Sequence, residues 1–316
     1  MMDIQKIGII GTGYVGMAAA FAIFQQQLAT ELVLIDKNVS RAEGEALDLM
    51  HGQPLVGRCT VRAGDFEDLE GAGLVIICAG VSQSSPDENR LDLLKRNISV
   101  FEMIARELDR YAPNALLLIA SNPVDILTQA MQCLSARPRQ LIIGTGTYLD
   151  TSRFRTLLAQ YYDVSPNSVH AYILGEHGDS EIAVWSSAAI GGLPVQENTI
   201  NGREFDVEKM DTLFCRVKNA AYDIIASKGH TNWAIGLVIA GILRTIRDDQ
   251  RRILPVSVRL EGEYGIENVC LSIPTIVGSQ GIENHILPDL NEDELKGLRL
   301  SAQTLLEPLE ALNLTH

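Results

Sequence analysis

Residues 6–16 read K-I-G-I-I-G-T-G-Y-V-G, and this stretch decides the fold. A short apolar run passes directly into glycines at the G-x-G-x-x-G spacing, which is typical of a strand–turn–helix unit that binds a dinucleotide. The first glycine permits a tight turn, the second lets a pyrophosphate approach the backbone, and the third lets helix and strand pack closely. The phosphates are expected at the N-terminus of the following helix. The expected cofactor contacts in this unit are Gly11, Gly13, Val15 and Gly16.

A carboxylate further along the chain indicates which dinucleotide is bound. Asp36 ends the second apolar run, twenty residues after Gly16. A carboxylate at this place suits the two ribose hydroxyls of adenosine and would repel the extra phosphate of NADP. Asp36 could instead be an ordinary helix N-cap, but the glycine motif that precedes it favours cofactor binding. The sequence therefore predicts NAD as the cofactor.

The first half of the chain alternates between continuous apolar runs and helix-like segments. Uninterrupted apolar runs are typical of parallel strands covered on both faces. The expected strands are 6–11, 31–36, 73–80, 115–120 and 141–144, and the expected helices are 14–27, 41–50, 91–111 and 124–134. This order predicts an α/β fold with a doubly wound parallel sheet, a Rossmann domain, over residues 1–144.

The pattern changes to a mixed α+β arrangement in residues 145–316, which we expect to form the catalytic, substrate-binding domain. No low-complexity linker separates the halves, so they are expected to pack closely. The expected elements are helices at 151–162, 207–246 (with a break at Gly229) and 292–312, and strands at 253–260 and 267–276.

Composition excludes several classes of protein. The 316 residues carry a formal net charge of −14, which argues against binding to nucleic acid or to anionic membranes. Neither a long apolar span nor a secretory signal is visible, which favours the cytoplasm. The five cysteines are scattered and form no C-x-x-C pair, so we expect reduced thiols and no metal site.

Long motifs in the second half resemble the L-lactate dehydrogenases, and the resemblance covers nearly the whole chain. Malate dehydrogenases share this framework. The motifs are A-S-N-P-V-D (120–125), G-T-Y-L-D-T-S-R-F-R (146–155), A-Y-I-L-G-E-H-G-D-S (171–180), K-G-H-T-N-W-A-I-G-L (228–237) and L-P-V-S-V-R-L-E-G-E-Y-G (254–265).

The resemblance implies a role for each matching residue. His177 matches the family's catalytic acid/base, and Asp150 matches its carboxylate partner. Arg153 matches the arginine that binds the substrate carboxylate, and Arg90 matches the arginine that polarises the reacting carbonyl. The remaining matches are Asn122 and Thr231 in the substrate pocket, and Gly80, Asn122 and Ile235 at the cofactor.

The chemistry of 2-keto acid reduction requires these residue types independently. Hydride goes to the carbonyl carbon and a proton goes to its oxygen, and an imidazolium can donate that proton near neutral pH. A neighbouring carboxylate fixes the tautomer of the imidazole. One guanidinium binds the planar substrate carboxylate in a two-pronged geometry, and a second stabilises charge on the oxygen.

The polar octet Q-S-S-P-D-E-N-R (83–90) is expected to be the lid over the substrate. It is one residue longer than the family's common Q-K-P-G-E-T-R pattern. The resemblance implies that substrate is selected near Gln83 or, if the insertion shifts the register, near Ser84. Both are neutral, and no arginine lies between Gly80 and Arg90, so a dicarboxylic acid would bury an unpaired charge.

Lactate is therefore favoured over malate, and the reaction expected is the interconversion of pyruvate and L-lactate. Several alternatives stay open at this point. The nearest is a related L-2-hydroxy-acid or malate dehydrogenase, and the longer lid leaves room for a bulkier 2-keto acid. A non-catalytic NAD-binding protein should have lost the residues named above, and an NAD-dependent glycosidase needs a Cys/His metal site that we do not find.

Two further cations match an effector site of many bacterial lactate dehydrogenases. Arg155 and His170 correspond to the arginine and histidine that bind fructose 1,6-bisphosphate across a two-fold subunit interface. The resemblance thus implies a homotetramer and activation by this sugar phosphate. The alternative is a solvated helix charge at Arg155 and an interface strand residue at His170.

Overall fold

The computed structural model describes residues 4–81 and 89–315, with Arg90 described by its backbone alone. A nine-stranded sheet crosses the molecule in the order β12-β11-β10-β6-β5-β4-β1-β2-β3. The six strands from β3 to β6 run parallel, as the continuous apolar runs predict. They are β1 (Lys6–Ile10), β2 (Glu31–Ile35), β3 (Thr60–Ala63), β4 (Leu74–Ile77), β5 (Leu116–Ile119) and β6 (Ile142–Gly144).

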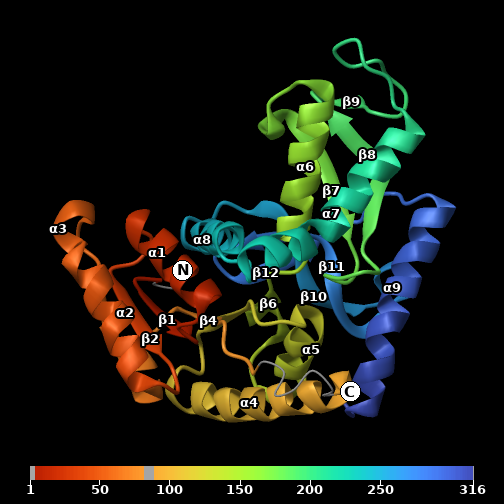
Figure 1. The fold of residues 1–316 in the computed structure, drawn as a ribbon. Coiled ribbons are helices and arrows are strands. Elements are labelled where there is room, and N and C mark those ends of the chain that lie inside the picture. The colour runs from red at the N-terminus through yellow and green to blue at the C-terminus, as the bar shows by residue number, and fades with distance from the viewer. Residues whose placement is uncertain (1–3, 82–88, 316) are drawn as a thin grey trace.

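Helices cover both faces of this parallel sheet (Figure 1), which confirms the doubly wound prediction. Successive strand residues point to opposite faces. Ile9 and Leu34 pack into a core with α1, α2 and α8, whereas Ile10 and Ile35 pack into a second core with α4 and α5. The helices of this half are α1 (Tyr14–Gln25), α2 (Val39–His51), α3 (Gln53–Val56), α4 (Arg90–Tyr111) and α5 (Val124–Leu134).

The later part of the chain extends the same sheet and adds a second one. Strands β10 to β12 run antiparallel, and Ser257 of β10 pairs with Gly144 of β6. A separate antiparallel sheet, β7-β8-β9, packs on α6 and α7 around a third core. Its strands are β7 (Val169–Leu174), β8 (Ile182–Ile190) and β9 (Leu193–Pro194), and the other strands are β10 (Arg252–Glu261), β11 (Glu267–Gly278) and β12 (Gly281–His285).

Four long helices complete this half, and short 3-10 turns connect several elements. The long helices are α6 (Tyr148–Tyr162), α7 (Val207–Lys228), α8 (Trp233–Arg247) and α9 (Glu292–Ala311). The 3-10 turns are η1 (Phe66–Leu69), η2 (Arg139–Leu141), η3 (Pro166–Ser168) and η4 (Glu263–Gly265). None of the helices within the described ranges is long and apolar enough to cross a membrane.

The structure differs from the sequence-based expectation at several boundaries. The predicted break at Gly229 is present, because this glycine ends α7 with a φ of +84°. Helix α6 begins at Tyr148, three residues before the predicted start, so Asp150 lies inside its first turn. The edge strands β3 and β12 were not predicted, because their mostly half-exposed residues form no continuous apolar run.

Helix α8 brings the later half of the chain against the first helix. A Cβ atom on Gly236 would lie 2.7 Å from the backbone carbon of Ala18, so the two helices approach to backbone contact at this point. Because α1 follows the glycine-rich turn directly, this contact sets where the first turn of α8 lies relative to that turn.

We expect Gly236→Ala to destabilise the protein by about 1–3 kcal/mol, because the added methyl group must push α8 away from α1. Gly241→Ala in the same helix is the matched control, since its Cβ would meet only the Tyr148 hydroxyl, at 3.9 Å. That control should gain up to about 1 kcal/mol from helix propensity. Urea unfolding midpoints measure both effects, and equal midpoints for the two variants would contradict the close approach.

Candidate active site

The glycine-rich turn between β1 and α1 has the three properties that the motif predicts. Gly11 has a φ of +98°, and a Cβ atom there would lie 2.7 Å from the backbone nitrogen of Ala79. A Cβ on Gly16 would overlap the carbonyl oxygen of Gly11, so helix and turn are in direct contact. At Gly13, by contrast, a Cβ would meet nothing within 4 Å.

Asp36 is held at the end of β2 by the same turn. Its Oδ2 accepts hydrogen bonds from the backbone N–H of Thr12 at 2.8 Å and from the Thr12 hydroxyl at 3.0 Å. Its Oδ1 accepts from the backbone N–H of Asn38 at 2.9 Å. Partial burial opposes ionisation, but these hydrogen bonds outweigh it and lower the pKa of Asp36. The carboxylate is therefore ionised and fixed in place.

These residues fit a dinucleotide. Gly13 is the N-cap of helix α1 and has no side chain to cap it, so the N–H groups of the first turn can bind an anion in the open space in front of that glycine. The Asp36 oxygens retain lone pairs for ribose hydroxyls. Val15 lies in the first turn of α1 and packs partly on the core.

Two other predicted cofactor contacts lie at the carboxyl edge of the parallel sheet. The Ser121 hydroxyl donates to the carbonyl oxygens of Ile77 and Ala79, at 3.2 and 2.5 Å, and so ties the ends of β4 and β5 together. Gly80 and Asn122, which follow these two ends, are both exposed. Ligands of open α/β sheets bind at this edge.

The loop between α7 and α8 lies against the glycine-rich turn. The ring of His230 stacks on the ring of Tyr14 with centroids 3.7 Å apart and planes within 7°. The next residue, Thr231, is half-buried, and Ile235 packs partly on the core from the first turn of α8. The stacking of His230 on Tyr14 therefore places the loop next to the first turn of α1.

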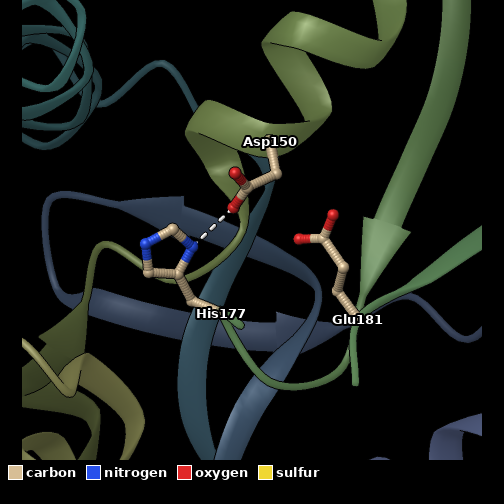
Figure 2. A group of neighbouring side chains, drawn as sticks. All are labelled: Asp150, His177 and Glu181. Atoms are coloured by element: carbon tan, nitrogen blue, oxygen red, sulfur yellow. Dashed lines mark hydrogen bonds and ion pairs between the residues drawn. The ribbon is translucent and has the colours of Figure 1, made fainter. Parts of the chain in front are cut away.

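His177, Asp150 and Arg153 lie together where the β7–β8 loop meets the first turns of α6. The Nδ1 of His177 lies 2.6 Å from Oδ2 of Asp150 (Figure 2), and Nη1 of Arg153 donates to the other oxygen, Oδ1, at 2.7 Å. The Asp150 side chain is only 4% exposed, against 26% for His177. One buried carboxylate thus pairs with two cationic groups.

Hydrogen bonds fix the start of α6, and with it Asp150. The Thr147 hydroxyl donates to the carbonyl oxygen of Ile173 in β7 at 2.6 Å, and the Thr147 N–H donates to the Ser272 hydroxyl in β11 at 2.9 Å. The Thr151 hydroxyl accepts from the N–H of Ile173 at 2.9 Å. The first turn of α6 is therefore bonded on both sides of Asp150 to strands that are distant in sequence.

The loop that carries His177 is held by a residue to which the sequence assigned no role. Asp125, in the first turn of α5, accepts from the backbone N–H of His177 at 2.8 Å and from the Ser257 hydroxyl at 2.6 Å. Burial raises the pKa of Asp125 to about 6, in spite of these hydrogen bonds. Asp125 is the last residue of the A-S-N-P-V-D motif, so the sequence marked the position but did not indicate which residues it would contact.

The electrostatics of the site favour a charged imidazole. Burial works against the imidazolium, but the carboxylate of Asp150 outweighs it and raises the pKa of His177 to about 9. Burial likewise opposes the Asp150 carboxylate, yet His177 and Arg153 lower the pKa of Asp150. The pair is therefore an ion pair at neutral pH, with a proton on the imidazole ready for transfer.

A second acid that the sequence did not single out, Glu181, approaches this pair (Figure 2). Ligand atoms of Asp150, His177 and Glu181 lie within 4.8 Å of one another, which is a spacing that a metal ion could use. Both oxygens of Asp150 are already bonded to His177 and Arg153, however, and the neighbouring guanidinium would repel another cation. This donor set fits proton chemistry better than a metal.

The lid predicted at residues 83–90 is described only from Asn89 onward. Gln83 lies outside the described residues, and so does the side chain of Arg90. The backbone of Arg90 is the first residue of α4, where the side chain of Asn89 accepts from the N–H of Leu91 at 3.0 Å.

The two residues of the predicted effector site come from adjoining elements. In α6, Nε of Arg155 donates to the carbonyl oxygen of Ala171 at 2.9 Å, and its guanidinium lies 5.2 Å from the ring centroid of Tyr172. His170, on β7, is exposed. Arg155 is thus partly exposed and His170 exposed, on the adjoining elements α6 and β7.

Comparisons with known proteins identify the family over nearly the whole chain. Residues 5–144 match the NAD-binding domain of the lactate/malate dehydrogenases, and residues 147–313 match their α/β C-terminal domain. The chain is 53% identical to an L-lactate dehydrogenase of Salinibacter ruber, over 96% of each chain. It is 44% identical to that of Thermus aquaticus, over 98% of this chain and 99% of the relative.

Solved structures give the same result. A minor L-lactate dehydrogenase of Enterococcus mundtii superposes with a TM-score of 0.94 at 40% identity, over 97% of this chain and 98% of that one. A lactate dehydrogenase from a deep-sea metagenome library of the Medee basin has a TM-score of 0.95 at 38% identity, over the full length of both. NAD is the cofactor that this domain pair implies. The chain is a member of the lactate/malate dehydrogenase family of NAD-dependent enzymes.

Proposed function

We propose that the protein is an L-lactate dehydrogenase that interconverts pyruvate and L-lactate, with His177 as the acid/base. The observation that carries this proposal is the pairing of one buried carboxylate, Asp150, with both His177 and Arg153. A 2-keto acid presents a carbonyl oxygen that needs a proton and a carboxylate that needs a guanidinium. The site offers these two groups side by side, and the relatives named above are lactate dehydrogenases.

The mechanism depends on which ring nitrogen of His177 can still reach the substrate. The Nδ1 of His177 is committed to Asp150, so Nε2 is the atom that exchanges a proton with the substrate oxygen. Bound NADH supplies the hydride for the carbonyl carbon. In the reverse direction a neutral His177 accepts the hydroxyl proton of lactate, and Asp150 stabilises the resulting imidazolium.

Arg153 is proposed to bind the substrate carboxylate. Its bond to Asp150 uses Nη1, and a guanidinium carries further N–H donors in a fork that matches a planar carboxylate. The bond also orients the side chain, which is 16% exposed. Asn122 and Thr231 are proposed to line the pocket, with Gln83 and Arg90 closing over it from the lid.

We also propose a set of cofactor contacts and a division of the chain into two domains. Residues 1–144 are proposed to bind NAD, with Ile235 contributing an apolar contact to the nicotinamide ring from the other half, and residues 145–316 to provide the substrate site. The proposed cofactor contacts are Gly11, Gly13, Val15, Gly16, Asp36, Gly80, Asn122 and Ile235. The proposed location is the cytoplasm.

A panel of 2-keto acids with NADH tests the substrate. We expect kcat/KM for pyruvate to exceed that for oxaloacetate by at least about a hundredfold, because an unpaired second carboxylate would cost about 3 kcal/mol or more on burial. Branched 2-keto acids test whether the longer lid widens the range. Preference for oxaloacetate would favour the malate dehydrogenase alternative, and no turnover of any 2-keto acid would refute the proposal.

The two directions should have opposite pH limits. Pyruvate reduction needs protonated His177, so its rate should fall as the pH rises through about 9, whereas lactate oxidation should rise over the same range. His177→Asn is the control: it should abolish turnover in both directions while NADH still binds, as measured by cofactor fluorescence. Parallel pH profiles, or loss of NADH binding in the variant, would contradict the assigned role.

Arg155 and His170 are proposed to bind fructose 1,6-bisphosphate at a two-fold interface of a homotetramer. The positive charges of Arg155 and His170 from two subunits would face one another there. In the absence of effector, their repulsion would weaken the subunit contact. A doubly phosphorylated sugar would neutralise them and favour the assembled, active form. The position of both residues near the surface, on adjoining elements, supports this arrangement.

Fructose 1,6-bisphosphate should lower the apparent KM for pyruvate, most strongly in dilute protein where dissociation is favoured. The double variant Arg155→Gln/His170→Gln should lose this response. Sedimentation at matched concentrations reports the assembly state. A wild-type KM that does not respond to the effector between about pH 6 and 8, at any dilution, would rule the site out.

A further inference from the structure

Glu181 is a buried acid that the proposed mechanism does not use. It is the last residue of the loop that carries His177, immediately before β8, and it is only 4% exposed. Its side chain extends toward Asp150 and His177 (Figure 2). Its Oε1 is completely covered and has no hydrogen-bond partner among the described residues. If Glu181 were ionised, this oxygen would carry a buried negative charge without a hydrogen bond to stabilise it, which is costly.

The surroundings of Glu181 come from three elements. Asp150 and Arg153 face it from α6, His177 from the β7–β8 loop, and the partly exposed Lys218 from α7. Burial and the carboxylate of Asp150 together raise the pKa of Glu181 to about 8, although His177, Lys218 and Arg153 act in the opposite direction. At neutral pH the group is therefore a neutral carboxylic acid.

The net charge of the groups around Glu181 then matches a substrate with a single negative charge. With a proton on Glu181, the positive charges of His177, Arg153 and Lys218 exceed the negative charges of the two carboxylates, Asp150 and Asp125, by one. A bound monocarboxylate brings this sum to zero. If Glu181 ionises, the groups are already neutral, and the same substrate would bury an excess negative charge.

We propose that Glu181 is a positioning residue for the substrate anion: its proton leaves Arg153 and His177 with the net positive charge that a carboxylate needs. It acts through these two residues and does not exchange its proton with substrate. The proposal rests on the function proposed above, in which Arg153 binds the carboxylate of a 2-keto acid.

The pH dependence of KM for pyruvate separates this role from a structural one. Each group that must stay protonated for binding raises log KM by about one per pH unit above its pKa. Wild type should therefore approach a slope of about two at alkaline pH, from Glu181 and His177. Glu181→Gln cannot ionise and should approach about one, and its kcat and KM should stay within about threefold of wild type at pH 6–7.

Glu176→Gln is the matched control. Glu176 lies on the same loop, but its carboxylate is already bonded to the Ser180 hydroxyl, so its variant should keep the wild-type slope. Glu181→Met, which is also unable to ionise, replaces Glu181→Gln if thermal unfolding shows that the latter does not fold. Equal slopes in wild type and the neutral variant, or a tenfold higher KM of that variant at pH 6–7, would overturn the proposal.

A second measurement does not depend on turnover. The infrared band of a protonated carboxylic acid should be present in wild type at pH 7, disappear as the pH rises through about 8, and be missing from the neutral variant. Lack of turnover with any 2-keto acid would refute the proposed function. The infrared titration would still show whether Glu181 is protonated at pH 7. An ionised Glu181 at pH 7 would refute the inference alone.

Discussion

The placement of one buried carboxylate, Asp150, organises the chemistry of this protein. Burial alone would favour its neutral form, and the two cationic groups on its oxygens reverse that preference. The ionised carboxylate in turn keeps a proton on His177 and orients Arg153. A single desolvated charge thus couples the group that moves a proton to the group proposed to bind the substrate.

The scaffold makes that arrangement rigid. Asp150 is fixed because the first turn of α6 is bonded to β7 and β11, and His177 is fixed because its backbone is bonded to Asp125 in α5. Asp125 is also bonded to Ser257 in β10, the strand that joins the parallel sheet at β6. The geometry of the pair therefore depends on the continuation of the sheet past residue 144, which links the two halves.

The same site contains two buried acidic residues in addition to Asp150. Asp125 and Glu181 both have pKa values raised by burial, to about 6 and about 8. If Asp150, Asp125 and Glu181 were all ionised, they would balance the cations His177, Arg153 and Lys218 and leave no net positive charge for an anionic ligand, so the protonation of these acids decides how much positive charge is available. In this reading, substrate affinity depends on groups that need not touch the substrate.

The sequence by itself determined the doubly wound sheet, the dinucleotide turn and the family. These follow from local patterns: continuous apolar runs, glycines whose spacing reflects backbone contact, and long ordered motifs around His177 and Asp150. The start of helix α6 was predicted three residues too late, because hydrogen bonds to β7 and β11 set this boundary and no local sequence pattern indicates them.

Only the tertiary structure decided the environment of the charges. In the sequence, Asp125 and Glu181 are ordinary acidic residues, 52 and four positions from His177. Folding buries both beside the same imidazole, because strands and helices from distant segments close over the site. Burial is a property of all the segments that surround a group, and a pKa shift requires that burial together with specific neighbours. This is why the proton on Glu181 could be inferred only after the chain was seen folded.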